Sequence, residues 1–180
     1  GRRLVIDQDM GQNWPPVAAA PSGDARFRLL RTGIFPSFSP AGDRLAFTTG
    51  FAALLHNGMM VTSADGSNRW VIHDDLEHNT VAPVWSPLGD RIAFGSGGAF
   101  QGALGVKRQV SNIAVVAPDG SGFTLLTDGT GNNGFPSWSP DGTRIVFRAQ
   151  DERVKGLRIL DVQTRQVAVL TEGVAQNDNF

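Results

Sequence analysis

The chain of 180 residues contains no cysteine. Disulfide bonds and thiolate metal sites are therefore excluded, and cysteine usage indicates no particular redox compartment. No uninterrupted apolar run approaches the roughly 20 residues that a membrane-spanning helix needs. The 16 basic and 17 acidic residues leave a formal net charge of -1. Such a balance lacks the positive excess typical of nucleic-acid or anionic-membrane binding, so we expect neither a nucleic-acid partner nor a membrane span.

Glycine, in contrast, is abundant. The chain has 22 glycines and 10 prolines spread along its length, and glycine at about 12% exceeds the average of about 7%. This composition is typical of many short strands and turns rather than of long helices.

A stretch of thirteen residues occurs three times with small changes. Its copies are FPSFSPAGDRLAF at 35–47, APVWSPLGDRIAF at 82–94 and FPSWSPDGTRIVF at 135–147. The starting residues of successive copies are 47 and 53 positions apart. Such a period indicates a repeat architecture, which decides the fold before any local detail does.

The two ends of the chain fit the same period. GRRLVI at 1–6 matches the second half of the motif, and the final NDNF is placed where a further copy would begin. We therefore expect one domain over residues 1–180 with four repeats, the first of which lacks its inner strand. The repeats cover about residues 1–34, 35–81, 82–134 and 135–180.

Each repeat contains four short segments in which β-branched or aromatic residues alternate with others, as strands prefer. Ser-Pro-x-Gly separates the first two segments, since proline pre-sets φ for a tight turn and glycine accepts φ > 0. One aromatic residue near each such turn, Phe38, Trp85 or Trp138, is expected to fill the gap to the neighbouring sheet. A period of about 45 residues with four strands predicts an all-β chain, a β-propeller with four-stranded antiparallel blades. About four blades are present, as a fragment of a larger ring or as an assembling half-ring.

The motif Pro-x-Trp-Ser-Pro-Asp-Gly-x-Arg-Ile followed by an aromatic residue resembles the TolB-like β-propeller repeat, a WD-repeat-like unit of bacterial propellers. The resemblance covers essentially the whole chain. The copies depart from the motif at Phe38 for Trp and at Ala41 and Leu88 for Asp, and we expect the latter two to weaken the turn. The resemblance implies six to eight blades in complete proteins and a periplasmic or secreted location. The family includes protein-binding scaffolds, propellers attached to serine peptidases and some polysaccharide lyases.

Loop lengths indicate which face of the propeller varies. The Ser-Pro turns keep one length, whereas the loops between the second and third strands have 10, 17 and 8 residues. Binding residues usually gather where loops vary. We therefore expect a protein or peptide partner to bind at this end, which we call the variable-loop face. The candidate residues are Phe51, Phe100, Lys107, Arg108 and Asn132; a solvated loop around Phe100 is the alternative.

Several motifs suggest chemistry but have a simpler interpretation. GTGNNG at 129–134 has the spacing of a dinucleotide-binding loop but precedes a predicted strand, not the helix that such a site requires. DQDMG at 7–11 resembles the start of a calcium loop without its later ligands. His73 and Asp75 form a weak candidate pair for a cation, and Ser39, Ser86 and Ser139 precede prolines in structural turns. We expect no catalytic residues, no cofactor and no metal site.

Two classes of function follow. The first is a non-enzymatic scaffold that binds a protein or peptide through the variable-loop face. The alternative is the propeller portion of a secreted or periplasmic hydrolase, serine peptidase-like, or of a polysaccharide lyase, with its catalytic residues outside this segment. Because the last repeat stops at Phe180, before an inner strand that could complete the first, we also expect self-association through the incomplete blade edge.

Overall fold

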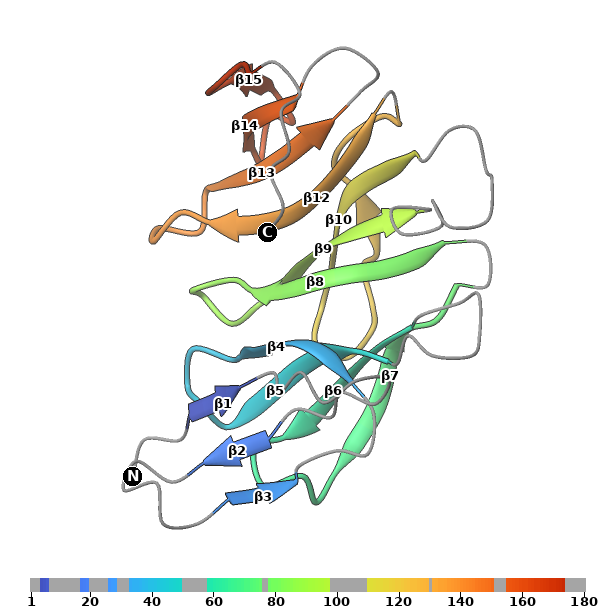
Figure 1. The fold of residues 1–180 in the computed structure, drawn as a ribbon, viewed down its shortest axis with the longest axis vertical. Helices are drawn as coiled ribbons and strands as arrows, with labels where there is room; N and C mark the ends of the chain where they lie inside the picture. The colour runs from blue at the N-terminus through green and yellow to red at the C-terminus, as the bar shows by residue number, and fades with distance from the viewer. Residues whose placement is uncertain are drawn as a thin grey trace.

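The computed structural model describes residues 4–6, 17–19, 26–28, 33–49, 58–75, 78–97, 110–129, 131–150 and 155–173. These segments hold fifteen β-strands and no helix (Figure 1). The all-β fold class predicted from the repeats is confirmed. In these segments there is likewise no helical stretch with the length and apolarity that a membrane crossing requires.

Successive strands pair antiparallel except at three breaks, and we call the four units between these breaks blades 1 to 4. Blade 1 has three strands and the other blades have four. Blade 1 contains β1 (Leu4–Ile6), β2 (Val17–Ala19) and β3 (Arg26–Arg28). Blade 2 contains β4 (Ile34–Phe38), β5 (Arg44–Thr48), β6 (Met59–Ser63) and β7 (Arg69–His73). Blade 3 contains β8 (Asn79–Trp85), β9 (Ile92–Gly97), β10 (Ser111–Val116) and β11 (Thr124–Leu125). Blade 4 contains β12 (Asn132–Trp138), β13 (Arg144–Gln150), β14 (Lys155–Asp161) and β15 (Val167–Val169). The breaks lie at β3–β4, β7–β8 and β11–β12.

The first strand of each four-stranded blade lies on the inside of the assembly. Strand β8 contacts both β4 and β12, and Figure 1 shows β8 across the middle of the molecule with β4 below it and β12 above it. Blades 3 and 4 are additionally joined by one parallel pair between Ser111 and Asn132. The blades are therefore arranged around a common side, as in part of a propeller, with β4, β8 and β12 nearest its axis.

The hydrophobic core lies between the blades rather than within any one of them. Strand β9 shows why, because its successive side chains point to opposite faces. Ile92 and Phe94 join a cluster that includes Ala46, Met59 and Val61 of blade 2. The intervening Ala93 joins a second cluster with residues of blade 4. Blade 3 thus buries both faces, one against blade 2 and one against blade 4.

Tryptophan side chains close the two central interfaces. Trp85 is 5% exposed and belongs to the cluster between blades 2 and 3. Trp138 packs against the cluster between blades 3 and 4, and its Nε1–H donates a hydrogen bond to the Val84 carbonyl oxygen at 3.1 Å. Both are the last residues of their strands, β8 and β12. The predicted role of these aromatic residues in filling the gap between blades is confirmed.

Replacing Trp85 with alanine should lower the free energy of unfolding by about 3–5 kcal/mol, because a large buried side chain is lost from an interface that cannot collapse fully. Chemical denaturation followed by fluorescence measures the change. Leu88→Ala is the matched control: its side chain is 67% exposed, so the loss should stay within about 0.5 kcal/mol. A loss of less than about 1 kcal/mol for Trp85→Ala would contradict a core built between blades.

Candidate functional site

The inner strands share an unusual backbone feature. The register of each with its neighbour shifts between Ile34 and Ser37, between Val81 and Val84, and between Gly134 and Ser137. Each shift is a β-bulge centred on an x-Pro pair: Phe35-Pro36, Ala82-Pro83 and Phe135-Pro136. Proline has no N–H to offer the ladder, so a bulge is where a strand accommodates it.

The residue before each of these prolines adopts a left-handed conformation. The φ angles of Phe35, Ala82 and Phe135 are 53°, 48° and 54°. Residues other than glycine rarely adopt such angles, and a following proline normally favours extended backbone. Strained backbone of this kind costs on the order of 1–3 kcal/mol per residue and persists only where the surroundings impose it. Its recurrence at one position in three blades makes this surface the first candidate for a site.

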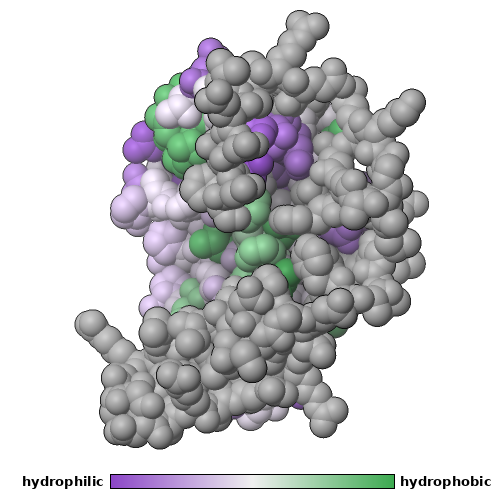
Figure 2. Space-filling model, in the orientation of Figure 1, coloured by the Kyte–Doolittle hydropathy of each residue, from purple (hydrophilic) through white to green (hydrophobic). Residues whose placement is uncertain are grey.

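The three bulges line a shallow hollow of about 430 Å³, which we call the axial groove. Phe35 and Phe135 meet edge to face across it, with their ring centroids 6.1 Å apart, and Phe135 is 42% exposed. Figure 2 shows hydrophobic residues near the centre of this face. The groove is lined by Phe35, Pro36, Ser37, Ala82, Pro83, Val84, Phe135 and Pro136.

Neighbouring strands hold the groove in shape. The Trp85 backbone N–H of β8 donates to Ser37 Oγ of β4 at 3.2 Å, which ties two blades together beside the bulges. On the other side, the guanidinium carbon of Arg148 lies 6.0 Å from the centroid of the Phe135 ring, a distance at the limit of cation–π attraction. Arg148 Nη2 also donates to Gln150 Oε1 at 2.7 Å. An arginine thus stands beside the apolar groove.

Of the predicted partner-binding residues, the structure describes Asn132. It begins β12, where it pairs with Gln150 at the end of β13 and with Ser111 at the start of β10. Asn132 therefore lies at the end of the blades where the variable loops attach, on the strand that carries Phe135. The other candidates, Phe51, Phe100, Lys107 and Arg108, lie outside the described residues, and their role stays a prediction.

Phe35, Phe135 and Arg148 are the residues of this region that sequence analysis missed. Phe35 and Phe135 open two copies of the repeated motif, so their position was visible, but the motif was interpreted only as strand and turn. The bulge that turns them toward the axis is a change of register between strands. No residue type in the motif indicates it except the proline that follows.

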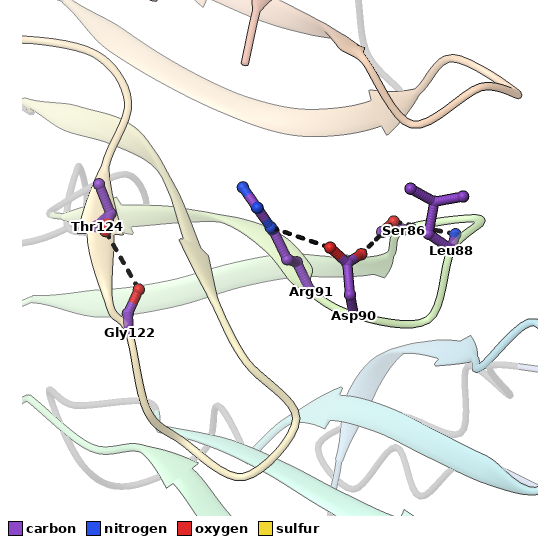
Figure 3. Close-up of polar contacts among 6 residues, drawn as sticks. All are labelled: Ser86, Leu88, Asp90, Arg91, Gly122 and Thr124. Atoms are coloured by element: carbon purple, nitrogen blue, oxygen red, sulfur yellow. Dashed lines mark hydrogen bonds and ion pairs between the residues drawn. The ribbon is translucent and has the colours of Figure 1, made fainter. Parts of the chain in front are cut away.

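The three serines of the Ser-Pro turns have structural partners. The Oγ–H groups of Ser39, Ser86 and Ser139 donate to carboxylates of Asp43, Asp90 and Asp141 at 2.7, 2.9 and 2.6 Å. Figure 3 shows the middle turn, where Asp90 also pairs with Arg91 Nε at 3.2 Å. The glycines of these turns have the positive φ angles, 71° to 74°, that the sequence predicts.

The turns that carry Ala41 and Leu88 keep one hydrogen bond of the third turn and lack two others. Asp141 accepts the N–H and the hydroxyl of Thr143 in addition to the Ser139 hydroxyl. Weaker turns at Ala41 and Leu88 stay a prediction.

In the third turn the carboxylate stands before the glycine, at Asp141, whereas the first two turns place it directly after the glycine, at Asp43 and Asp90. In both arrangements the carboxylate accepts the serine hydroxyl. The acceptor of the serine hydroxyl is therefore kept in all three turns.

The hydrogen bonds in the third turn also set its titration. The Ser139 hydroxyl, followed by the N–H and hydroxyl of Thr143, lowers the pKa of Asp141 from 3.8 to about 2. In the first turn the Ser39 hydroxyl is the largest cause of a lowered pKa at Asp43. Donors that favour the ionised carboxylate produce such shifts. Ser39 and Ser139 therefore stabilise the ionised form of these two carboxylates.

The remaining motifs have structural roles where they are described. His73 stacks on Phe123 with ring centroids 4.7 Å apart, and His78 Nδ1 lies 2.8 Å from Asp75 Oδ2. Within the described segments, no three His, Cys, Asp or Glu side chains lie close enough to hold a metal ion. The glycine-rich stretch leads into β12, a strand, as expected. The acidic stretch at 7–11 lies outside the described residues.

Comparison with known proteins supports the propeller fold. The structure is similar to that of a putative TolB from Agrobacterium tumefaciens, with a TM-score of 0.75 and 19% identity, over 96% of this chain and 61% of that chain. It is also similar to an oligogalacturonate lyase from Vibrio parahaemolyticus, with a TM-score of 0.74 and 12% identity, over 97% of this chain and 50% of that chain.

A curated relative supports the first of these likenesses in sequence. A stretch of 56 residues, 31% of this chain, is 34% identical to 12% of a TolB homologue from Protochlamydia amoebophila. No family model matches the chain. The chain spans less than two thirds of each of these proteins. At identities of 12–19%, the structural matches show the fold.

The turn analysis makes a prediction about pH. Ser139→Ala should raise the pKa of Asp141 from about 2 toward its ordinary 3.8, because it removes the largest cause of the shift. Since the folded pKa is the lower one, the stability that this carboxylate contributes is present above about pH 4 and is lost as pH falls through about 2.

An NMR titration of the carboxyl carbons measures the shift directly. Thr124→Ala is the control, since the Thr124 hydroxyl donates to the Gly122 carbonyl oxygen at 3.2 Å and to no carboxylate. An Asp141 pKa that stays near 2 in Ser139→Ala would show that the serine is not its main partner.

Proposed function

We propose that this chain, whose fold is similar to that of TolB propellers, is a non-enzymatic scaffold that binds a protein or peptide partner through its variable-loop face and the adjoining axial groove. The partner contacts apolar residues near the axis and polar residues at the variable-loop end of the blades, where Asn132 begins its strand. The protein works in the periplasm or after secretion, as the family resemblance implies.

The axial groove is the observation that supports this function most directly. Its described lining consists of aromatic, proline, serine and small apolar residues, which supply contact area rather than proton transfer. Exposed aromatic side chains on a rigid backbone lose little entropy on binding and often provide most of the binding energy. The bulges fix Phe35 and Phe135 in place before a partner arrives, so binding does not have to order them.

The variable loops supply the second part of the proposed interface. Phe100 with Lys107 and Arg108 combines an apolar anchor with two cations, a set suited to a peptide that carries an acidic group. Phe51 belongs to the corresponding loop of blade 2. These loops differ in length between repeats, whereas the Ser-Pro turns at the opposite end do not.

A second candidate function is supported by the likeness to the oligogalacturonate lyase. In that case this segment is the propeller part of a lyase or hydrolase whose catalytic residues lie elsewhere. A nucleophile elbow, G-x-S-x-G, in an attached domain would favour a hydrolase. Self-association stays a separate prediction, which light scattering coupled to gel filtration tests.

Peptides selected against the immobilised chain from a random phage-displayed library test the scaffold function. The double variant Phe100→Ala and Arg108→Ala should weaken their binding about tenfold or more, since it removes an anchor and a charge. The melting temperature should stay unchanged because the sequence predicts both residues in a loop outside the strands of the blade. Phe135→Ala in the axial groove should weaken the same peptides.

Ala41→Ser and Leu88→Ala, in turns at the opposite end, are the matched controls and should leave binding intact. If these controls abolish binding while the loop and groove variants retain it, the partner binds the opposite face and the proposal is wrong.

A further inference from the structure

A second hollow lies away from the axis, between the outer edges of blades 3 and 4. Its volume is about 560 Å³, within the usual range of ligand sites. We call it the rim groove. One wall comes from the end of blade 3 and the other from β13, β14 and β15 of blade 4. It is lined by Leu125, Leu126, Thr127, Asp128, Gly131, Asn133, Phe147, Ala149, Gln150, Arg158, Arg165 and Val167.

The groove exists because the outermost strand of blade 3 stops early. Strand β11 has only two residues, Thr124 and Leu125. The Leu126 N–H still donates to the Ile113 carbonyl oxygen at 2.7 Å, but the Ile113 N–H donates to the side chain of Thr127, not to its backbone, at 3.1 Å. The regular ladder ends there, which leaves space beside blade 4 over the buried Phe147.

Strand β15 borders this space with an open backbone edge. The Leu170 N–H donates to Leu157 O, and Gln166 O accepts from the Asp161 N–H. Along an antiparallel strand, every second residue directs its backbone N–H and C=O groups to the neighbouring strand. Since Gln166 and Leu170 direct theirs to β14, the N–H and C=O groups of Val167 and Val169 point away from it. No described strand pairs with this edge.

The side chains of β15 do not protect that edge. Val167 and Val169 are 47% and 55% exposed. Natural edge strands usually carry charges or other features that prevent pairing with a further strand. An apolar, unpaired edge beside a groove is instead the arrangement by which sheets accept a peptide as an added strand.

Two arginines give the groove a positive character. Arg158 Nη1 donates to the Thr171 carbonyl oxygen at 3.0 Å, which holds its guanidinium group on β14. Arg165 occupies a left-handed position in the β14–β15 turn, with φ of 59°. Neither forms an ion pair with a carboxylate among the residues that the structure describes. Asp128 is the one acidic side chain in the lining, against these two cations.

The register shows which side of an added strand would meet the arginines. Arg158 pairs with Val169 across β14 and β15, and directly paired residues share a face of the sheet. Arg158 lines the groove, as does Val167, two residues before Val169. Every second side chain of a peptide added to β15 would therefore point to the groove side, within the field of Arg158 and Arg165.

We propose that the rim groove and the open edge of β15 bind an extended acidic peptide, which adds to blade 4 as a fifth strand. Main-chain hydrogen bonds to Val167 and Val169 give the affinity. Carboxylates at alternate positions of the peptide meet Arg158 and Arg165 and give the specificity. This surface is distinct from the axial groove and does not depend on the function proposed there.

Fluorescence anisotropy with dye-labelled peptides tests the proposal. The first probe alternates valine with glutamate over eight residues; the second alternates valine with lysine. A third repeats the valine–glutamate sequence with N-methyl groups on alternate amides, so that it keeps its charge but cannot pair along one edge. We expect the first probe to bind at least about tenfold more tightly than either of the others.

Variants locate the binding on the rim. Arg158→Gln and Arg165→Asn should each weaken the first probe several-fold, and asparagine readily adopts the left-handed conformation at position 165, so the fold is kept. Val169→Pro removes an edge N–H that β14 does not use and should also weaken binding. Arg91→Gln is the control, since Arg91 pairs with Asp90 in a turn of blade 3, and it should leave binding unchanged.

Three results would overturn the proposal: equal binding of the N-methylated probe, equal binding of the lysine probe, or full affinity in the double variant Arg158→Gln and Arg165→Asn. Competition by free glutamate at the same concentration as the peptide would show a simple anion site, which would also contradict an added strand. Phe135→Ala should leave this probe unaffected, so failure here is separable from failure at the axial groove.

Discussion

The packing of each blade against the next is the interaction on which the rest of this structure depends. A four-stranded sheet with two apolar faces cannot be stable alone in water, because both faces would stay exposed. Strand β9 divides its side chains between the two neighbouring interfaces, and Trp85 and Trp138 complete those interfaces at the strand ends. The inner strands, the axial groove and the outer rim are all placed by this sheet-to-sheet contact.

The sequence allowed the architecture to be predicted because the same packing problem recurs in each repeat. Ser-Pro-x-Gly indicated the turns, and the aromatic residue before it indicated the interface between blades. The carboxylate kept in each turn could also have been predicted, since Asp43 and Asp90 stand where the third copy has Thr143. It was missed because each position was compared with the motif alone and not with the hydrogen bond that the motif serves.

Other features could not be predicted because they are relations between strands. The register shifts at Phe35, Ala82 and Phe135 depend on how many residues oppose one another across a ladder. The early end of β11 depends on the Thr127 side chain replacing a backbone partner. Both produce hollows, one at the axis and one at the rim. In this fold, departures from regular pairing create the candidate sites, whereas the repeated residues create the frame.

The two placements of the turn carboxylate have a consequence for how such repeats diverge. A chain that exchanged Asp141 for an uncharged residue before acquiring an acid at position 143 would pass through a turn without a carboxylate for the serine hydroxyl, which would keep only the Arg144 carbonyl oxygen. A chain that first gained the second acid would pass through Ser-Pro-Asp-Gly-Asp, in which either carboxylate can accept the serine hydroxyl. Ancestral or laboratory-evolved intermediates should therefore pass through the doubly acidic turn. The order in which the two substitutions occur then determines whether the intermediate turn keeps a carboxylate for the serine hydroxyl.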